Sequence, residues 1–148
     1  MGVVVVDDHL LRDVLVGHRD RDLGGLATGL ATTGLWLFRL SSSWATPTAA
    51  GKLSAPVAAL PIEQQERFVA QLVALPGDIE VVHLRQLAWS MAQLQHRHRV
   101  AGRQLSAAMV EALAAAHALG AGIAVSERDI GPNLRAAADH DRIGFHVL

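Results

Sequence analysis

The chain of 148 residues contains no cysteine. This absence excludes disulfide bonds and thiolate metal sites, and it fits the reducing conditions of a cytoplasm. Aromatic residues contribute only 4% of the composition, so the core of the folded chain is expected to be aliphatic. The formal net charge is −1. The chain as a whole therefore lacks the excess positive charge that is typical of nucleic-acid-binding proteins, and any basic surface must be local.

Long apolar runs are absent as well. The apolar start reaches Asp7 too soon to be the core of a signal peptide, and no stretch approaches the length of a membrane span. The sequence thus predicts a soluble cytoplasmic protein without membrane contact. Its length suits a single domain over residues 1–148, and 51% hydrophobic against 18% charged residues is typical of a compact globular chain.

Strand-like and helix-like patterns alternate along the chain. Val3 to Val6 is an unbroken β-branched run, typical of a central parallel strand covered on both faces. Further strands are predicted over residues 79–84, 122–125 and 143–148, and helices over residues 10–16, 23–32, 61–75, 85–97, 105–120 and 133–139. Residues 34–60 follow no single pattern, because "LWLFRL" suits strand or helix and "SSSWATPTAAG" suits a loop or a frayed helix start. The alternation predicts an α/β fold, a three-layer sandwich with a mainly parallel central sheet.

Two adjacent carboxylates, Asp7 and Asp8, follow the first predicted strand. Paired charge at the end of a parallel strand is costly, and that edge of the sheet is where α/β folds bind ligands, so a functional or ancestral role is favoured over accident. The opening "VVVVDDH" resembles a response-regulator receiver domain. Such a domain needs a phosphoacceptor aspartate at another strand end, and no Asp or Glu lies between Asp22 and Glu63, which excludes this interpretation.

A second resemblance covers most of the chain. The opening "VVVVDDHLL" is similar to the first strand of the PIN-domain family, in which apolar residues end in a metal-binding Asp with a Leu four positions later, here Asp7 and Leu11. "LSAAMVEALAAAHALGAGIAVSERD" and "NLRAAADHDRIGFHVL" follow that family's order of Ala-rich helix, short strand with a polar end, helix and final strand. The chain therefore resembles PIN domains, the metal-dependent ribonuclease fold of many bacterial toxin–antitoxin toxins.

This resemblance implies a hydrolase in which three or four carboxylates hold Mg²⁺ or Mn²⁺, and the metal activates water against an RNA phosphodiester. Asp7 fills the first acidic position, with Asp8 as a helper. The second, a Glu, has no counterpart between Leu23 and Ile62. The third falls on Met109 when the Ala-rich helix is aligned on its closing "LG".

Glu111 could replace Met109 only if the helix is shifted, because two residues are separated by about 200° around a helix. The fourth position lies in "SERD", where Glu127 or Asp129 could serve and Ser126 stands for the family's small hydroxyl residue. The resemblance thus implies Asp7, Glu111 and Asp129 as catalytic residues. It implies Asp7, Asp8, Glu127 and Asp129 as metal ligands.

Structural explanations of the same acids remain open. Glu111 suits a solvated helix face or a partner of the helix dipole. Glu127 with Arg128 suits a polar turn, and Asp129 suits a cap of the following helix.

The resemblance leaves two functional classes open. One is an active toxin ribonuclease acting on RNA. The other is a PIN-like binding or regulatory protein that has lost catalysis. An antitoxin protein and a second copy of the chain are the partners implied, and no DNA is expected.

A local basic patch lies in "HRHRVAGR". Arg97, Arg99 and Arg103 could contact nucleic-acid phosphate there, while a solvated helix end is the structural alternative. The histidines of this segment, His96 and His98, point apart on a helix and do not suggest a metal site.

The remaining histidines and tryptophans have structural interpretations. His83 and His117 are expected in the core or at its boundary. The three tryptophans, Trp36, Trp44 and Trp89, are expected as core or interface anchors rather than as a base-stacking platform.

Overall fold

A computed structural model describes residues 2–17, 23, 25–127 and 131–148. Five parallel strands form one sheet in the order β3-β2-β1-β4-β5. The strands are β1 (Gly2–Val6), β2 (Ala27–Thr33), β3 (Ile79–Val82), β4 (Gly122–Val125) and β5 (Phe145–Val147). The predicted α/β class with a mainly parallel central sheet is confirmed.

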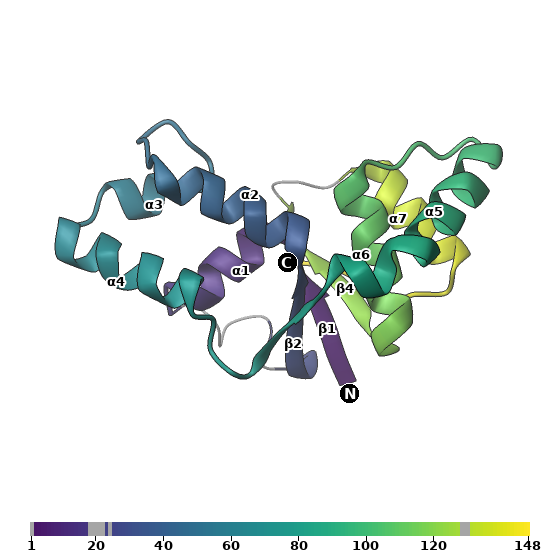
Figure 1. The fold of residues 1–148 in the computed structure, drawn as a ribbon, viewed down its shortest axis with the longest axis horizontal. Helices are drawn as coiled ribbons and strands as arrows, with labels where there is room; N and C mark the ends of the chain where they lie inside the picture. Colours follow the sequence, from purple (N-terminus) through teal and green to yellow (C-terminus); the bar gives the residue numbers. More distant parts are fainter. Residues whose placement is uncertain (1, 18–22, 24, 128–130) are drawn as a thin grey trace.

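Helices cover both faces of this sheet (Figure 1). One face carries α1 (Asp8–Leu15), α2 (Gly34–Ala45), α3 (Ala55–Ala58) and α4 (Ile62–Val73). The other carries α5 (Leu84–Val100), α6 (Ala107–Leu119) and α7 (Pro132–His140). No helix within the described residues is both long and apolar enough to cross a membrane.

The central strand serves two cores because successive side chains of a strand point to opposite faces. Val4 and Val6 join the cluster beneath α1 and α2, whereas Val5 joins the cluster beneath α6. All three are at most 3% exposed. The unbroken β-branched run of the sequence thus corresponds to a strand that is buried on both faces, as expected for the middle of a parallel sheet.

The helix predicted over residues 23–32 is wrong, because residues 27–33 form β2. Leu30 is in register with Val4 of β1 on one side and with Ile79 of β3 on the other. The backbone hydrogen bonds of two neighbouring strands outweigh the local helical pattern, which Gly29 already weakens. A Cβ on Gly29 would lie 3.4 Å from Cγ2 of Val3, which is an ordinary van der Waals contact.

The ambiguous "LWLFRLSSSW" segment is the helix α2. Thr33 ends β2 in an extended conformation, and its side chain accepts a hydrogen bond from the backbone N–H of Trp36. A threonine in this position caps the start of a helix. Strand end and helix start therefore follow each other directly.

Several side-chain predictions are tested by burial. Trp36 and Trp44 are core residues, as expected, but Trp89 is 75% exposed and is not a core residue. His83 and His117, expected in the core or at its boundary, are exposed, so neither is a core residue. The buried histidine of the basic segment is His98, which has no exposed surface.

The helix predicted over residues 61–75 is confirmed as α4, but its apolar stripe divides into two parts. Leu72 is buried, and Phe68 and Leu75 are half-buried against the core. Ile62 is 72% exposed and Val69 is 37% exposed.

Candidate functional site

The strand order places a crevice at the carboxyl end of β1. From β1 the chain runs outward through β2 to β3, and then crosses back to place β4 on the other side of β1. Open α/β sheets bind ligands outside the carboxyl ends of the strands where the order reverses in this way. Asp7 follows β1, and Ser126 and Glu127 follow β4, so two predicted site segments meet at this point.

Asp7 is 2% exposed and connects three elements at the crevice. One carboxylate oxygen, Oδ1, accepts a hydrogen bond of 2.8 Å from the backbone N–H of Leu10 and caps α1. The other, Oδ2, accepts a bond of 2.9 Å from the backbone N–H of Ser126. Ionised carboxylates are strong acceptors for such donors. Asp7 therefore joins the end of β1 to the start of α1 and to the end of β4.

A pocket of about 320 Å³ opens beside Asp7. Its polar lining includes Asp7, Arg39 and Glu127, and its apolar lining includes Trp36 and Met109. Met109 thus occupies the wall where the resemblance implies an acid. A Cβ added to Gly131 would lie 2.8 Å from the Met109 methyl group, so the methionine packs directly on the backbone that leads into α7.

Asp8 is fully buried and belongs to the contact between α1 and α2. Its Oδ1 accepts a hydrogen bond of 2.9 Å from the backbone N–H of His9, and its Oδ2 lies 3.1 Å from Nε of Arg39. Arg39 is about half exposed and also lines the pocket. A positive charge supplied by the protein therefore stands beside the acidic pair.

Glu111 is buried, with 1% of its surface exposed, and does not line the pocket. Its Oε1 accepts a hydrogen bond of 2.8 Å from the backbone N–H of Leu35, in the first turn of α2. Both carboxylate oxygens lie 3.9 Å from the position a Cβ would take on Gly34. The negative charge suits the positive end of the α2 dipole, so Glu111 docks α6 against the start of α2.

A Mg²⁺ site in this crevice would need oxygen ligands, because Mg²⁺ takes six of them in a near-octahedral arrangement. The pocket offers the carboxylates of Asp7 and Glu127, and Asp129 lies outside the described residues. Within the described part of the chain, no group of three or more histidine, aspartate or glutamate side chains could hold a metal ion. These residues alone do not form the acidic set that the resemblance implies.

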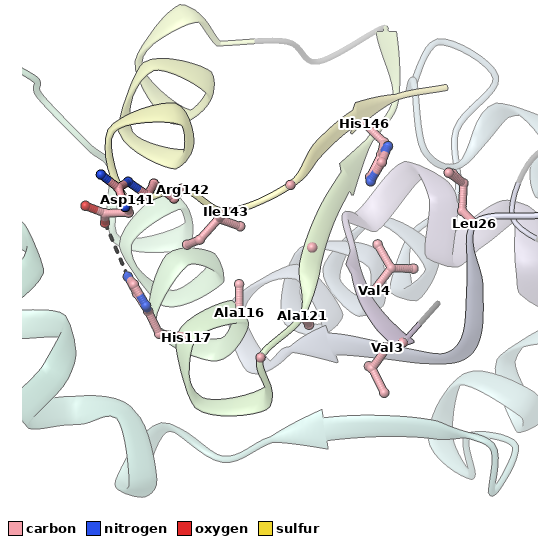
Figure 2. A pocket seen from close by; sticks show the side chains of 14 residues that line it. Val3, Val4, Leu26, Ala116, His117, Ala121, Asp141, Arg142, Ile143 and His146 are labelled. Carbon is pink, nitrogen blue, oxygen red and sulfur yellow. Dashed lines mark hydrogen bonds and ion pairs between the residues drawn. The ribbon is translucent and has the colours of Figure 1, made fainter.

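A second pocket, of about 450 Å³, lies at the opposite edge of the sheet, near the amino ends of β1, β4 and β5 (Figure 2). His117 and Asp141 point toward each other at one end of this pocket, and His146 lies at the other. The Asp141 side chain is 3% exposed. Sequence reasoning did not single out Asp141.

Asp141 gathers basic side chains from two helices. Its Oδ2 lies 3.0 Å from Nε2 of His98 and 3.4 Å from Nε2 of His117, and its Oδ1 lies 2.7 Å from Nη2 of Arg97. Burial raises the pKa of Asp141, but the hydrogen bonds from both histidines and the charge of Arg97 outweigh it, so the pKa lies below its ordinary value. This cluster joins the ends of α5, α6 and α7.

The three arginines of the predicted basic patch therefore have different surroundings. Arg97 pairs with Asp141, and Nε of Arg103 donates a hydrogen bond of 2.8 Å to Nδ1 of His98. Arg99 is exposed. The spacing in the sequence contained no sign of this difference, because Asp141 lies more than 40 residues further along the chain.

No protein-family model matches this chain, and no curated protein matches it. Among solved structures, the chain is similar to one in the structure of FitAB bound to an IR36 DNA fragment, with a TM-score of 0.60 and 18% identity, over 97% of this chain and 94% of that chain. It is also similar to one in the crystal structure of FitAcB from Neisseria gonorrhoeae, with a TM-score of 0.57 and 18% identity, over 97% and 96% of the two chains. At this identity the likeness shows the fold, which is PIN-like.

Proposed function

We propose that this chain is a PIN-like protein of the toxin–antitoxin type that acts by binding a protein partner and does not hydrolyse RNA. The fold and the PIN-domain resemblance support the broader statement. One observation supports the proposed loss of catalysis. The buried acids at the strand ends accept hydrogen bonds from backbone N–H groups or pair with an arginine.

Three acids of the implied set have a role in the fold. Asp7 connects α1 and the end of β4, Asp8 faces Arg39, and Glu111 holds the start of α2. A catalytic metal centre needs several carboxylates directed at one point, since only the cation offsets their repulsion. Here these carboxylates are directed at different partners, and Arg39 supplies positive charge beside Asp8.

The apolar part of the pocket supports the same proposal. Met109 packs where the third acid is implied, and the indole of Trp36 lines the pocket next to Asp7. Sulfur and aromatic side chains offer no hard oxygen ligand for Mg²⁺ or Mn²⁺. They suit contact with an apolar part of a partner.

A metal-dependent ribonuclease is the second candidate, because Asp7 and Glu127 line the same pocket where the strand order reverses. Its catalytic and ligand residues would be Asp7, Glu127 and Asp129, with RNA as substrate and Mg²⁺ or Mn²⁺ as cofactor. Glu111 is left out of this set because its carboxylate accepts the backbone N–H of Leu35.

The partner is proposed to be an antitoxin protein, and a homodimer is compatible with the same role. The FitAB structure contains a DNA fragment. The expectation that no DNA takes part is therefore not supported by this neighbour. Co-expression with the product of the adjacent reading frame, followed by size-exclusion chromatography, tests for the partner. A stable heteromeric complex is expected, and two separately eluting proteins would contradict the proposal.

The catalytic question is tested with metal and RNA. The melting temperature is measured against MgCl₂ and MnCl₂, and cleavage of a fluorescent single-stranded RNA is followed in the same buffers. Wild type is compared with Glu127→Gln at the pocket and with Glu66→Gln, an exposed α4 residue that undergoes the same charge change. Metal should not stabilise the protein specifically, and no cleavage should occur. Metal-dependent cleavage by wild type and Glu66→Gln that is lost in Glu127→Gln would establish the ribonuclease instead.

A further inference from the structure

A pocket of about 270 Å³ lies where α5 passes into α6, away from the strand-end crevice. Its lining is rich in side-chain N–H donors and consists of Gln95, Arg99, Arg103, Gln104 and Leu105. We infer that this pocket binds a phosphoryl group, either as a free phosphate or as part of a nucleic-acid backbone. The inference does not depend on the function proposed above.

The guanidinium of Arg103 is held in place from one side. Its Nε donates to Nδ1 of His98, which is fully buried and contacts Asp141 through Nε2. This chain of contacts fixes the plane of the guanidinium, so little side-chain freedom is lost when a ligand binds. Preorganised donors of this kind favour binding because the ordering cost is already met by the fold.

The same guanidinium has a donor without an acceptor. Nη2 of Arg103 is buried and has no hydrogen-bond partner. Buried donors are nearly always paired, and an unpaired one costs free energy. An oxyanion in the adjacent pocket would supply the missing acceptor. Because Nη2 has almost no exposed surface, the side chains that cover it must turn before an oxyanion can reach it. Arg99 and Gln104 line the same pocket and are exposed, so they are able to turn.

The charge around the pocket favours an anion. Residues 81–110 contain no aspartate or glutamate. The carboxylate reached through His98, Asp141, is paired with Arg97, which leaves the charges of Arg99 and Arg103 uncompensated within the pocket. The carbonyl end of α5 opposes an anion with about half an elementary charge. Two full positive charges exceed it.

The chemical type of the donors points to phosphate. Arginine presents a planar fork of N–H groups that matches the oxygens of phosphate, and glutamine adds neutral amide donors. The pocket lining contains four side chains that carry such donors, those of Gln95, Arg99, Arg103 and Gln104. A tetrahedral oxyanion can accept from all of them. Arg97 is not part of this set, because Asp141 holds it.

Binding is tested with three probes: inorganic phosphate, adenosine monophosphate and a short single-stranded RNA. Phosphate and the nucleotide are titrated by NMR with observation of the arginine Nε–H signals, and RNA is titrated by fluorescence anisotropy. The test variant is Arg99→Gln, which leaves the Arg103–His98 bond intact. The matched control is Arg85→Gln, an exposed arginine on the first turn of the same helix and outside the pocket.

Wild type and Arg85→Gln should bind at least one probe with the same affinity, and Arg99→Gln should bind about tenfold more weakly, the effect of one charge-assisted hydrogen bond. The Arg103 Nε–H signal should shift on saturation. Binding of phosphate and nucleotide alike would assign a free-phosphate site, and binding of RNA alone would assign the backbone of a nucleic acid. No binding of any probe, or equal weakening by both variants, would overturn the inference.

Discussion

The two edges of the sheet satisfy buried carboxylates by different means. At the carboxyl edge, Asp7 and Glu111 accept hydrogen bonds from backbone N–H groups of α1, α2 and the end of β4. At the amino edge, Asp141 accepts from the side chains of His98, His117 and Arg97. Backbone donors are present at every helix start and strand end whatever the sequence, whereas side-chain donors must be supplied by particular residues.

This difference separates two kinds of acid. A carboxylate held by backbone keeps its donors at every pH at which the fold persists, so its removal leaves those donors unpaired. A carboxylate held by histidine and arginine belongs to a network of charges that responds to pH and salt. Asp7 and Glu111 are therefore expected to matter most for stability, and Asp141 to matter in a manner that depends on conditions.

The largest effect is expected for Glu111→Ala. The substitution removes a fully buried side chain and leaves the N–H of Leu35 without its acceptor, so the free energy of unfolding should fall by about 2–4 kcal/mol. Urea denaturation measures the change. Glu111→Gln is the matched control, because its amide oxygen can still accept, and it should lose clearly less. Equal stability of wild type and the Ala variant would show that α2 does not depend on this bond.

For Asp7→Asn, the direction of the change in stability distinguishes a structural acid from a metal ligand. Asparagine has one acceptor oxygen for the two N–H donors of Leu10 and Ser126, and its amide group would face a donor, so about 1–3 kcal/mol of stability should be lost. An acid whose main role is to hold a metal behaves in the opposite way without metal, because its removal relieves repulsion. The melting temperatures of wild type and Asp7→Asn in EDTA distinguish the two roles. A variant more stable than wild type would support the ribonuclease.

Asp141→Asn should cost less, about 1–2 kcal/mol at neutral pH, because Arg97 loses a charged partner while His98 keeps an acceptor. The hydrogen bonds and the charge of Arg97 hold the pKa of Asp141 below its ordinary value despite burial, so its stabilisation is complete above about pH 4. As the pH falls through the lowered pKa of the folded state, the carboxyl is protonated and this stabilisation is lost. Wild type and variant should therefore converge in acid. A difference that is constant from pH 7 to pH 3 would contradict the charge network.

The smallest effect concerns a single proton. Because Nε of Arg103 donates to Nδ1 of His98, that nitrogen must be bare, and the proton of a neutral ring must lie on Nε2 toward Asp141. Nitrogen-15 NMR of the His98 ring in the wild type should show this tautomer. In Arg103→Gln the tautomer preference should weaken. A proton on Nδ1 in wild type would show that the network is oriented in another way.

Sequence patterns identified most of the strands and helices, and they failed where long-range pairing outweighed local preference. The run from Val3 to Val6 and the Ala-rich helix α6 carry their own signals in composition and spacing. The strand β2 does not, because its conformation is maintained by ladders to β1 and β3. α2 was ambiguous for a related reason: its start depends on Thr33 and on Glu111, which lies 76 residues beyond Leu35.

The candidate site shows the same limit. The sequence placed Asp7 and Glu127 at strand ends, and the structure brings both to one pocket. It could not show that Arg39 faces Asp8, or that Glu111 points at the start of α2. Those facts depend on which helices pack together. Asp129 stays a prediction.

By itself, the sequence determined that this chain folds as a parallel α/β sandwich with acids at the ends of its strands, because hydrophobic periodicity and strand-end polarity are local properties. Only the tertiary structure decided what each acid does. A carboxylate's role depends on the donors that surround it, and these donors come from elements distant in the chain. Asp7, Glu111 and Asp141 are alike in chemistry, and their neighbours in space make them a strand-end connector, a helix anchor and the centre of a charge cluster.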